Sequence, residues 1–119
     1  MDRKGHLFIG IVAFLAFQWL LGSAGAAARD PWPVGIICTL AGSVFPDAIE
    51  PAYSSRHRGI FHSRGTLMLA SALFIALGLA SAVSLPGGKI PLAYPASCFL
   101  LGYLSHLLAD ATTPAGLPR

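Results

Sequence analysis

The sequence predicts an all-α protein that crosses a membrane several times, and three observations support this class. Hydrophobic residues make up 55% of the 119-residue chain. Charged residues make up only 11%, which is less than half of the usual share in soluble proteins. Long apolar stretches recur along the chain, and about 20 such residues cross the hydrocarbon as a helix. At this length we expect one membrane-embedded domain over residues 1–119, a small bundle of about four transmembrane helices.

Four apolar segments account for the expected helices. They cover residues 7–28, 33–46, 66–85 and 90–109. Gln18 is the only strongly polar side chain of the first segment. The second has only 14 residues, so we expect it to be short, tilted or partly buried in protein. Pro91, Pro95 and His106 interrupt the fourth. A homo-oligomer would help to bury Gln18 and the thin second helix.

The first segment also has features of a cleaved signal peptide, because it follows a charged start and ends in the small residues "SAGAAA". Its apolar run is longer than that of a usual signal peptide, and further membrane segments follow. We therefore expect this segment to be retained as a membrane helix.

Basic residues predict how the chain is oriented in the membrane. With four crossings, the N-terminus, the loop between the second and third helices and the C-terminus share one side. That side carries Arg3, Lys4, Arg56, Arg58, Arg64 and Arg119. The other side carries only Arg29 and Lys89, so the positive-inside rule predicts cytoplasmic termini. Few aromatic residues lie among the arginines, so we expect membrane lipids as partners and no nucleic acid.

All four histidines and three of the five acids fall at this predicted cytoplasmic boundary. They are His6, Asp47, Glu50, His57, His62, His106 and Asp110. His106 and Asp110 are four residues apart, so they project from one face of a helix. A single histidine or acid at a membrane boundary is often a simple anchor, and His57 and Glu50 fit a solvated loop equally well. Ionisable groups at membrane depth, however, usually mark function.

Imidazole nitrogen and carboxylate oxygen together form a ligand set that suits divalent metals. The sequence therefore predicts a polar metal-binding layer at the cytoplasmic face of the bundle. Zinc is the favoured metal, as one or two ions. Arg58 or Arg64 near such a site would hold a phosphate or a carboxylate.

Four motifs of the chain resemble those of the YdjM-type family of inner-membrane proteins, which are classed as metal-dependent hydrolases. They are "GHL" at 5–7, "FPDAIEP" at 45–51, "HRGIFHS" at 57–63 and "LGYLSHLLADATTPAGLP" at 101–118. The resemblance covers nearly the whole chain, in order. It implicates His6, Asp47, His57, His62, His106 and Asp110. Family members often carry a second acid two residues after the aspartate that matches Asp47. Here the next acid, Glu50, comes three residues after Asp47, so its role as a metal ligand is left open.

The order of these residues is also similar, more loosely, to zinc-dependent phospholipase C and to P1-type nucleases. By that analogy Asp47, His62, His106 and Asp110 would hold one metal. His6 and Asp110 would contact a second. The later ligands of those soluble enzymes have no counterpart here, so three metals are not expected.

These resemblances imply a membrane-embedded hydrolase that cleaves a lipid or lipid-linked phosphoester by metal-activated water. Arg58 or Arg64 would bind the substrate phosphate, and His57 would be a proton shuttle if it is not a ligand. The alternative is a non-catalytic membrane protein. It would use the cluster for structural metal binding, or its arginine loop for anionic lipids.

Overall fold

The computed structural model of the chain is a bundle of four α-helices, and it describes residues 3–25, 31–51, 59–83, 90–113 and 117. The elements are α1 (Arg3–Ser23), α2 (Trp32–Ile49), the short 3₁₀ helix η2 (Ile60–His62), α3 (Arg64–Ala82) and α4 (Ala93–Ala111). No strand occurs in these described segments. The predicted all-α, four-helix class is therefore confirmed.

The second helix, α2, is longer than the predicted segment 33–46. The prediction that it ends at Pro46 was wrong. The helix continues through Pro46 to Ile49. A proline inside a helix loses one hydrogen bond and strains the turn before it, but its carbonyl can still accept, and the Pro46 carbonyl accepts a hydrogen bond from the N–H of Glu50 at 2.9 Å. At 18 residues, α2 is about 27 Å long. This places Asp47 inside the last turn of the helix, and no longer after its end.

Local signals explain where the other helices begin. Ser63 caps α3, and its hydroxyl accepts a hydrogen bond from the N–H of Thr66 at 3.2 Å. Pro95 lies in the first turn of α4, where an N–H has no partner inside the helix and its loss costs little. The predicted interruption at Pro95 is thus part of a helix start.

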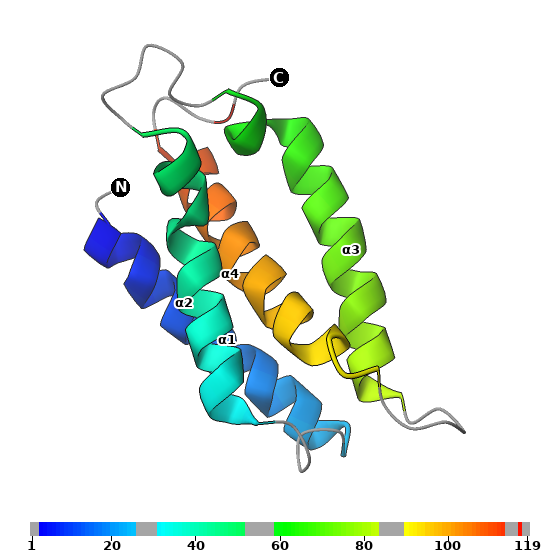
Figure 1. Cartoon of the computed structure of the whole chain (residues 1–119). Coiled ribbons are helices and arrows are strands. Elements are labelled where there is room, and N and C mark those ends of the chain that lie inside the picture. The colour runs from blue at the N-terminus through cyan, green and yellow to red at the C-terminus, as the bar shows by residue number, and fades with distance from the viewer. Residues whose placement is uncertain (1–2, 26–30, 52–58, 84–89, 114–116, 118–119) are drawn as a thin grey trace.

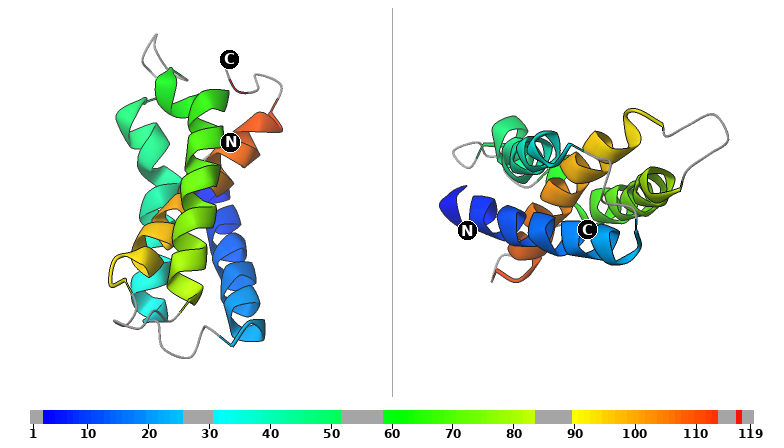
Figure 2. Two further views of the ribbon diagram at one scale, coloured as in Figure 1. Left: turned by 90° about the vertical axis from the view of Figure 1, so that its right-hand side faces the viewer. Right: turned by 90° about the horizontal axis from the view of Figure 1, so that it is seen from below.

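Three of the four helices are long and apolar enough to cross a membrane: α1, α2 and α3. The fourth, α4, lies among them and contacts all three (Figures 1 and 2). Its buried residues extend from Ala93 to Asp110. Large side chains on the outer helices, such as Trp19 and Met68, are more than 70% exposed. This exposure suits a protein whose outer helices face lipid and whose polar helix is shielded by them.

The closest helix contact joins α2 to α4 through small residues. A Cβ atom added at Gly102 of α4 would overlap the backbone carbonyl of Thr39, and one added at Gly42 of α2 would overlap the carbonyl of Phe99. Small residues at such positions let two helix backbones approach closely, as is common between membrane helices. This contact fixes the height of α4 relative to α2 and so positions the polar residues that both helices carry.

Candidate metal centre

Five of the residues singled out from the sequence come together at one end of the bundle, each on a different turn of the structure. His6 lies in the first turns of α1, Asp47 in the last turn of α2, and His62 at the end of η2. His106 and Asp110 share one face of α4. The three histidines are 0–2% exposed. We call these five residues the polar cluster.

Two carboxylate oxygens of the polar cluster, one from Asp47 and one from Asp110, lie close to the same pair of histidine nitrogens. The Nε2 atoms of His62 and His106 are 3.3 Å apart. The Asp47 Oδ1 atom lies 3.5 Å from each of them. The Asp110 Oδ2 atom lies 3.6 Å from His106 Nε2 and 3.9 Å from His62 Nε2. A tetrahedral zinc ion with bonds of about 2.0–2.1 Å needs ligand atoms about 3.4 Å apart, so these separations fit such an ion.

Hydrogen bonds on the far side of each ring fix the protonation of these two histidines. His106 Nδ1 lies 2.8 Å from the carbonyl oxygen of Ser43, which can only accept. His62 Nδ1 lies 2.8 Å from a carboxylate oxygen of Glu50. In neutral rings both Nδ1 atoms therefore carry the hydrogen, and both Nε2 atoms present a lone pair. In this tautomer the two Nε2 atoms, 3.3 Å apart, could both bind one cation.

Glu50 is placed as a supporting residue behind His62. Its second oxygen accepts a hydrogen bond from the backbone N–H of Phe61 at 3.2 Å. Partial desolvation acts to raise the pKa of Glu50, but hydrogen bonds from His62 and Phe61 outweigh it, so the pKa lies below its usual 4.5. Carboxylates that hold the distal nitrogen of a metal-binding histidine orient the ring and raise its basicity.

The two oxygens of Asp110 face different histidines. Oδ2 faces His62 and His106, as above, while Oδ1 lies 3.5 Å from His6 Nε2. The His6 ring also stacks on the His106 ring, with centroids 3.8 Å apart. Two overlapping sets of residues could thus hold an ion: His62, His106 and Asp110, or His6, Asp47 and His106. Because Asp110 has one oxygen toward His62 and His106 and the other toward His6, it could bind a single ion or bridge a pair of ions.

One of three comparisons with known proteins found a match. The model of the YdjM inner membrane protein family matches residues 1–119. The chain belongs to this family. No curated protein and no solved structure matches the chain. The looser similarity of this YdjM protein to phospholipase C and P1-type nucleases therefore stays a prediction.

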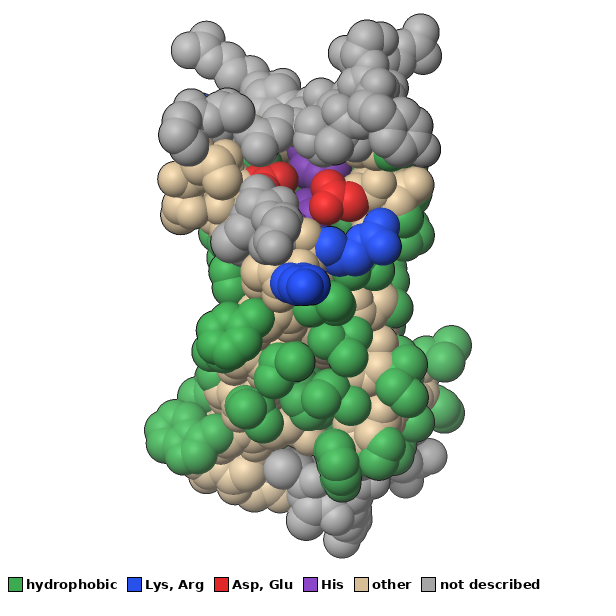
Figure 3. Space-filling model, turned by 90° about the vertical axis from the view of Figure 1, so that its left-hand side faces the viewer, with side chains coloured by type: hydrophobic (Ala, Val, Ile, Leu, Met, Phe, Trp, Pro, Cys, Tyr) green, Lys and Arg blue, Asp and Glu red, His purple; other side chains and the backbone are tan. Residues whose placement is uncertain are grey.

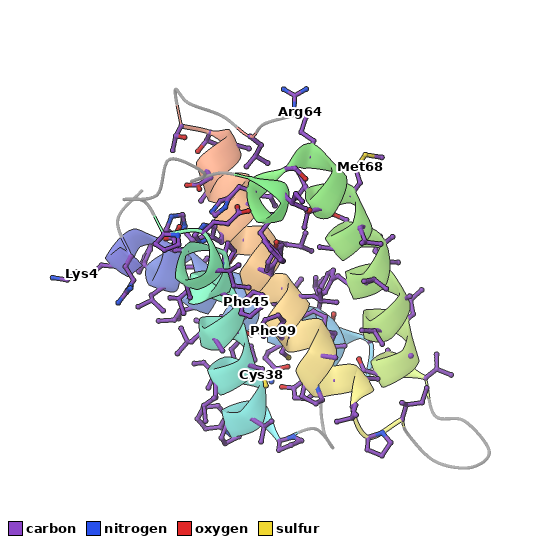
Figure 4. The ribbon with its side chains drawn as sticks, turned by 45° about the horizontal axis from the view of Figure 1, so that its top comes forward. Lys4, Cys38, Phe45, Arg64, Met68 and Phe99 are labelled. Carbon is purple, nitrogen blue, oxygen red and sulfur yellow. The ribbon has the colours of Figure 1, made fainter. Side chains whose placement is uncertain are left out.

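The other predicted site residues of the YdjM chain do not join the polar cluster in the described structure. His57 and Arg58 lie outside the described residues. Arg64 begins α3, is exposed, and points away from the bundle in Figure 4. It is not brought to the polar cluster, so its phosphate-binding role stays a prediction. Figure 3 shows acidic and histidine side chains together near one end of the molecule, with Lys and Arg side chains beside them.

Two parts of this site in the YdjM chain were missed from the sequence. One is the Ser43 carbonyl that holds His106, and the other is Tyr103, whose hydroxyl donates to the Phe61 carbonyl at 2.6 Å. Ser43 precedes Asp47 by four residues on α2, which would have placed both on one helix face. No residue type signals that a backbone carbonyl will be used.

Replacing Glu50 with glutamine tests its supporting role. The amide oxygen still accepts hydrogen bonds, but the negative charge behind His62 is lost. We expect metal affinity to fall about 10–100-fold, measured by competition with a chromogenic chelator. Ser63→Ala, which weakens the neighbouring cap of α3, is the control and should leave metal affinity unchanged. Wild-type affinity in Glu50→Gln would show that this carboxylate does not support a metal ligand.

Proposed function

We propose that this YdjM family protein is a membrane-embedded, metal-dependent hydrolase that acts on a phosphoester of a lipid or lipid-linked substrate. The observation that carries the proposal is the double use of Asp110, whose two oxygens lie toward His106 and toward His6. Such a carboxylate suits paired metal ions, which act together in many enzymes that displace a group at phosphorus.

The polar cluster has one partly open edge, which a catalytic site requires. The side chain of Asp47 is 28% exposed, whereas those of His62 and Asp110 are 0% and 3% exposed. A water molecule or a phosphate group would therefore enter beside Asp47. When bound in the cluster, a divalent cation supplies an activated water at neutral pH and stabilises negative charge that develops on a phosphoryl group.

The residues of the chain would supply positioning and proton handling. Glu50 and the Ser43 carbonyl hold the two histidine rings in the tautomer that leaves Nε2 without a proton. Asp47, at the open edge, is placed to accept a proton from a water molecule that approaches the cluster. The buried acids and rings also exclude bulk water from all but this edge.

Orientation is part of the proposal. Arg3, Lys4 and Arg64 begin α1 and α3 at the same end of the bundle as η2 and the end of α4 (Figure 1). Basic residues at one end favour the cytoplasmic side of a multi-pass protein. The polar cluster would then face the cytosol at the depth of the lipid headgroups.

A second candidate function follows from the burial of the same site. If Asp47, His62, His106 and Asp110 all bind one ion, its tetrahedral shell is complete, as in structural zinc sites. Such an ion would join α2, η2 and α4 without catalysing a reaction.

Metal removal separates the two functions. The purified protein is treated with a chelator and then supplied with Zn²⁺ or Mn²⁺, while metal content and phosphate release from phosphatidic acid vesicles are measured. We expect the hydrolytic activity to disappear on chelation and to return with the metal. Bound metal that restores thermal stability but supports no turnover would favour the structural function. A protein that binds no metal would contradict both.

A further inference from the structure

A groove of about 200 Å³ lies between α2, α3 and α4, at the end of the bundle that carries the polar cluster. Phe61 of η2 lies at one end of it, and Leu73 of α3 lines it further along the bundle. The α3 residues of its wall, from Thr66 to Leu73, cover about 10 Å along the helix axis. Since α3 is a candidate membrane span, this wall lies where lipid chains pack.

The walls of the groove present carbon to its interior. Phe45 and Phe99 lie side by side between α2 and α4 in Figure 4, with ring centroids 5.2 Å apart. Among the described side chains that line the groove, only Thr66 and Tyr103 carry polar groups. The Thr66 hydroxyl donates to the Ile60 carbonyl, and that of Tyr103 donates to the Phe61 carbonyl. With both hydroxyls used on η2, the groove suits an alkyl chain better than a peptide.

The same hydrogen bonds connect the groove to the polar cluster. Phe61 lines the groove, its carbonyl accepts from Tyr103, and its N–H donates to Glu50. Glu50 in turn holds His62, the next residue after Phe61. One short turn of chain thus separates an apolar wall from a cation-binding group. A molecule that uses both would need a phosphate at one end and a hydrocarbon chain next to it.

We propose that this groove binds an acyl chain of the substrate, so that the substrate class is a phospholipid-type phosphoester with its head at the polar cluster. This inference rests on the proposed function for the head, whereas the groove can be tested separately. Each methylene that leaves water for the groove should raise affinity about fourfold. Chains longer than the groove should gain nothing more from it.

The experiment measures binding of methyl, butyl, hexyl and octyl phosphate to the detergent-solubilised protein by titration calorimetry. Leu69→Trp narrows the groove at a lining residue that is 62% exposed. Met68→Trp is the matched control, because Met68 is the preceding residue, is 74% exposed, and points away from the bundle in Figure 4. Partition of the probes into micelles is the same for all proteins and cancels in the ratio of variant to wild-type affinity.

For Leu69→Trp we expect a ratio near one with methyl phosphate, and a loss of about tenfold or more with octyl phosphate. Met68→Trp should keep a ratio near one for every probe. A flat ratio for Leu69→Trp, or equal losses in both variants, would overturn the proposal. If Leu69→Trp leaves the affinity ratio flat but changes the size of the protein particle in detergent, the groove would instead be a contact between two copies of the chain.

Two further measurements keep the result decisive. Metal content of each variant is checked, and Leu73→Trp, at another lining residue, replaces Leu69→Trp if the latter loses its metal. The titrations are repeated on chelated protein. If affinity depends on chain length but not on metal, the groove is supported and the proposed hydrolase site fails. If affinity depends on metal but not on chain length, the metal site is supported and the proposal for the groove fails.

Discussion

Replacing Asp110 with asparagine is expected to abolish metal binding and, with it, the metal-dependent phosphoester turnover. The amide has nearly the same shape as the carboxylate, but it has no charge and offers only one oxygen. It cannot present a charged oxygen on each side, as Asp110 does toward His106 and toward His6. Metal content by mass spectrometry and phosphate release from phosphatidic acid vesicles measure the two effects.

Leu108→Ala is the control for Asp110→Asn, because Leu108 lies two residues away on the exposed face of α4. It should keep wild-type metal content and turnover. An unchanged thermal transition before metal is added would show that Asp110→Asn still folds. Full metal content and full turnover in Asp110→Asn would remove the polar cluster as the centre of activity.

The second large effect is expected at the contact between α2 and α4. Replacing Gly102 with alanine places a methyl group where the Thr39 carbonyl lies, so the two helices must separate. Although alanine is the better helix former, we expect the free energy of unfolding to fall by about 2–3 kcal/mol. Metal affinity should fall too, because α4 moves relative to Asp47 and to the Ser43 carbonyl. Unfolding in mixed micelles measures the first effect.

Gly78→Ala provides a matched comparison on α3. A Cβ atom added there meets no atom within 4 Å, so only helix propensity changes. We expect stability to stay the same or to rise by up to about 1 kcal/mol. Equal losses at Gly78 and Gly102 would mean that the contact between α2 and α4 is looser than described.

Much of the fold and the site could be predicted from the sequence, for physical reasons. Apolar runs report burial in lipid directly, so four helices were found. Ionisable residues are costly near a membrane, so His106 and Asp110 stood out. Helix ends were less certain, as Pro46 shows, because a proline usually disrupts a helix and the sequence alone did not reveal that α2 continues through it to Ile49. The polar cluster became specific only when distances between separate helices were known.

Features that depend on the backbone were beyond sequence analysis. The Ser43 carbonyl and the paired contacts of Gly42 and Gly102 involve atoms that every residue has. The groove beside Phe61 arises from three helices that are far apart in the sequence, and its lining resembles any apolar helix face. Patterns of residue type predict which face is buried, but they do not predict where packing leaves space.

The central place of α4 has a consequence for how the polar cluster forms. It follows α1, α2 and α3 along the chain, and these three are the candidate membrane spans among the described helices. It contacts each of the others, whereas α3 has at most weak contacts with α1 and α2. We therefore expect the position of α4 to depend on its packing against the other three helices. His106 and Asp110 would then reach the polar cluster only when these helix contacts have formed.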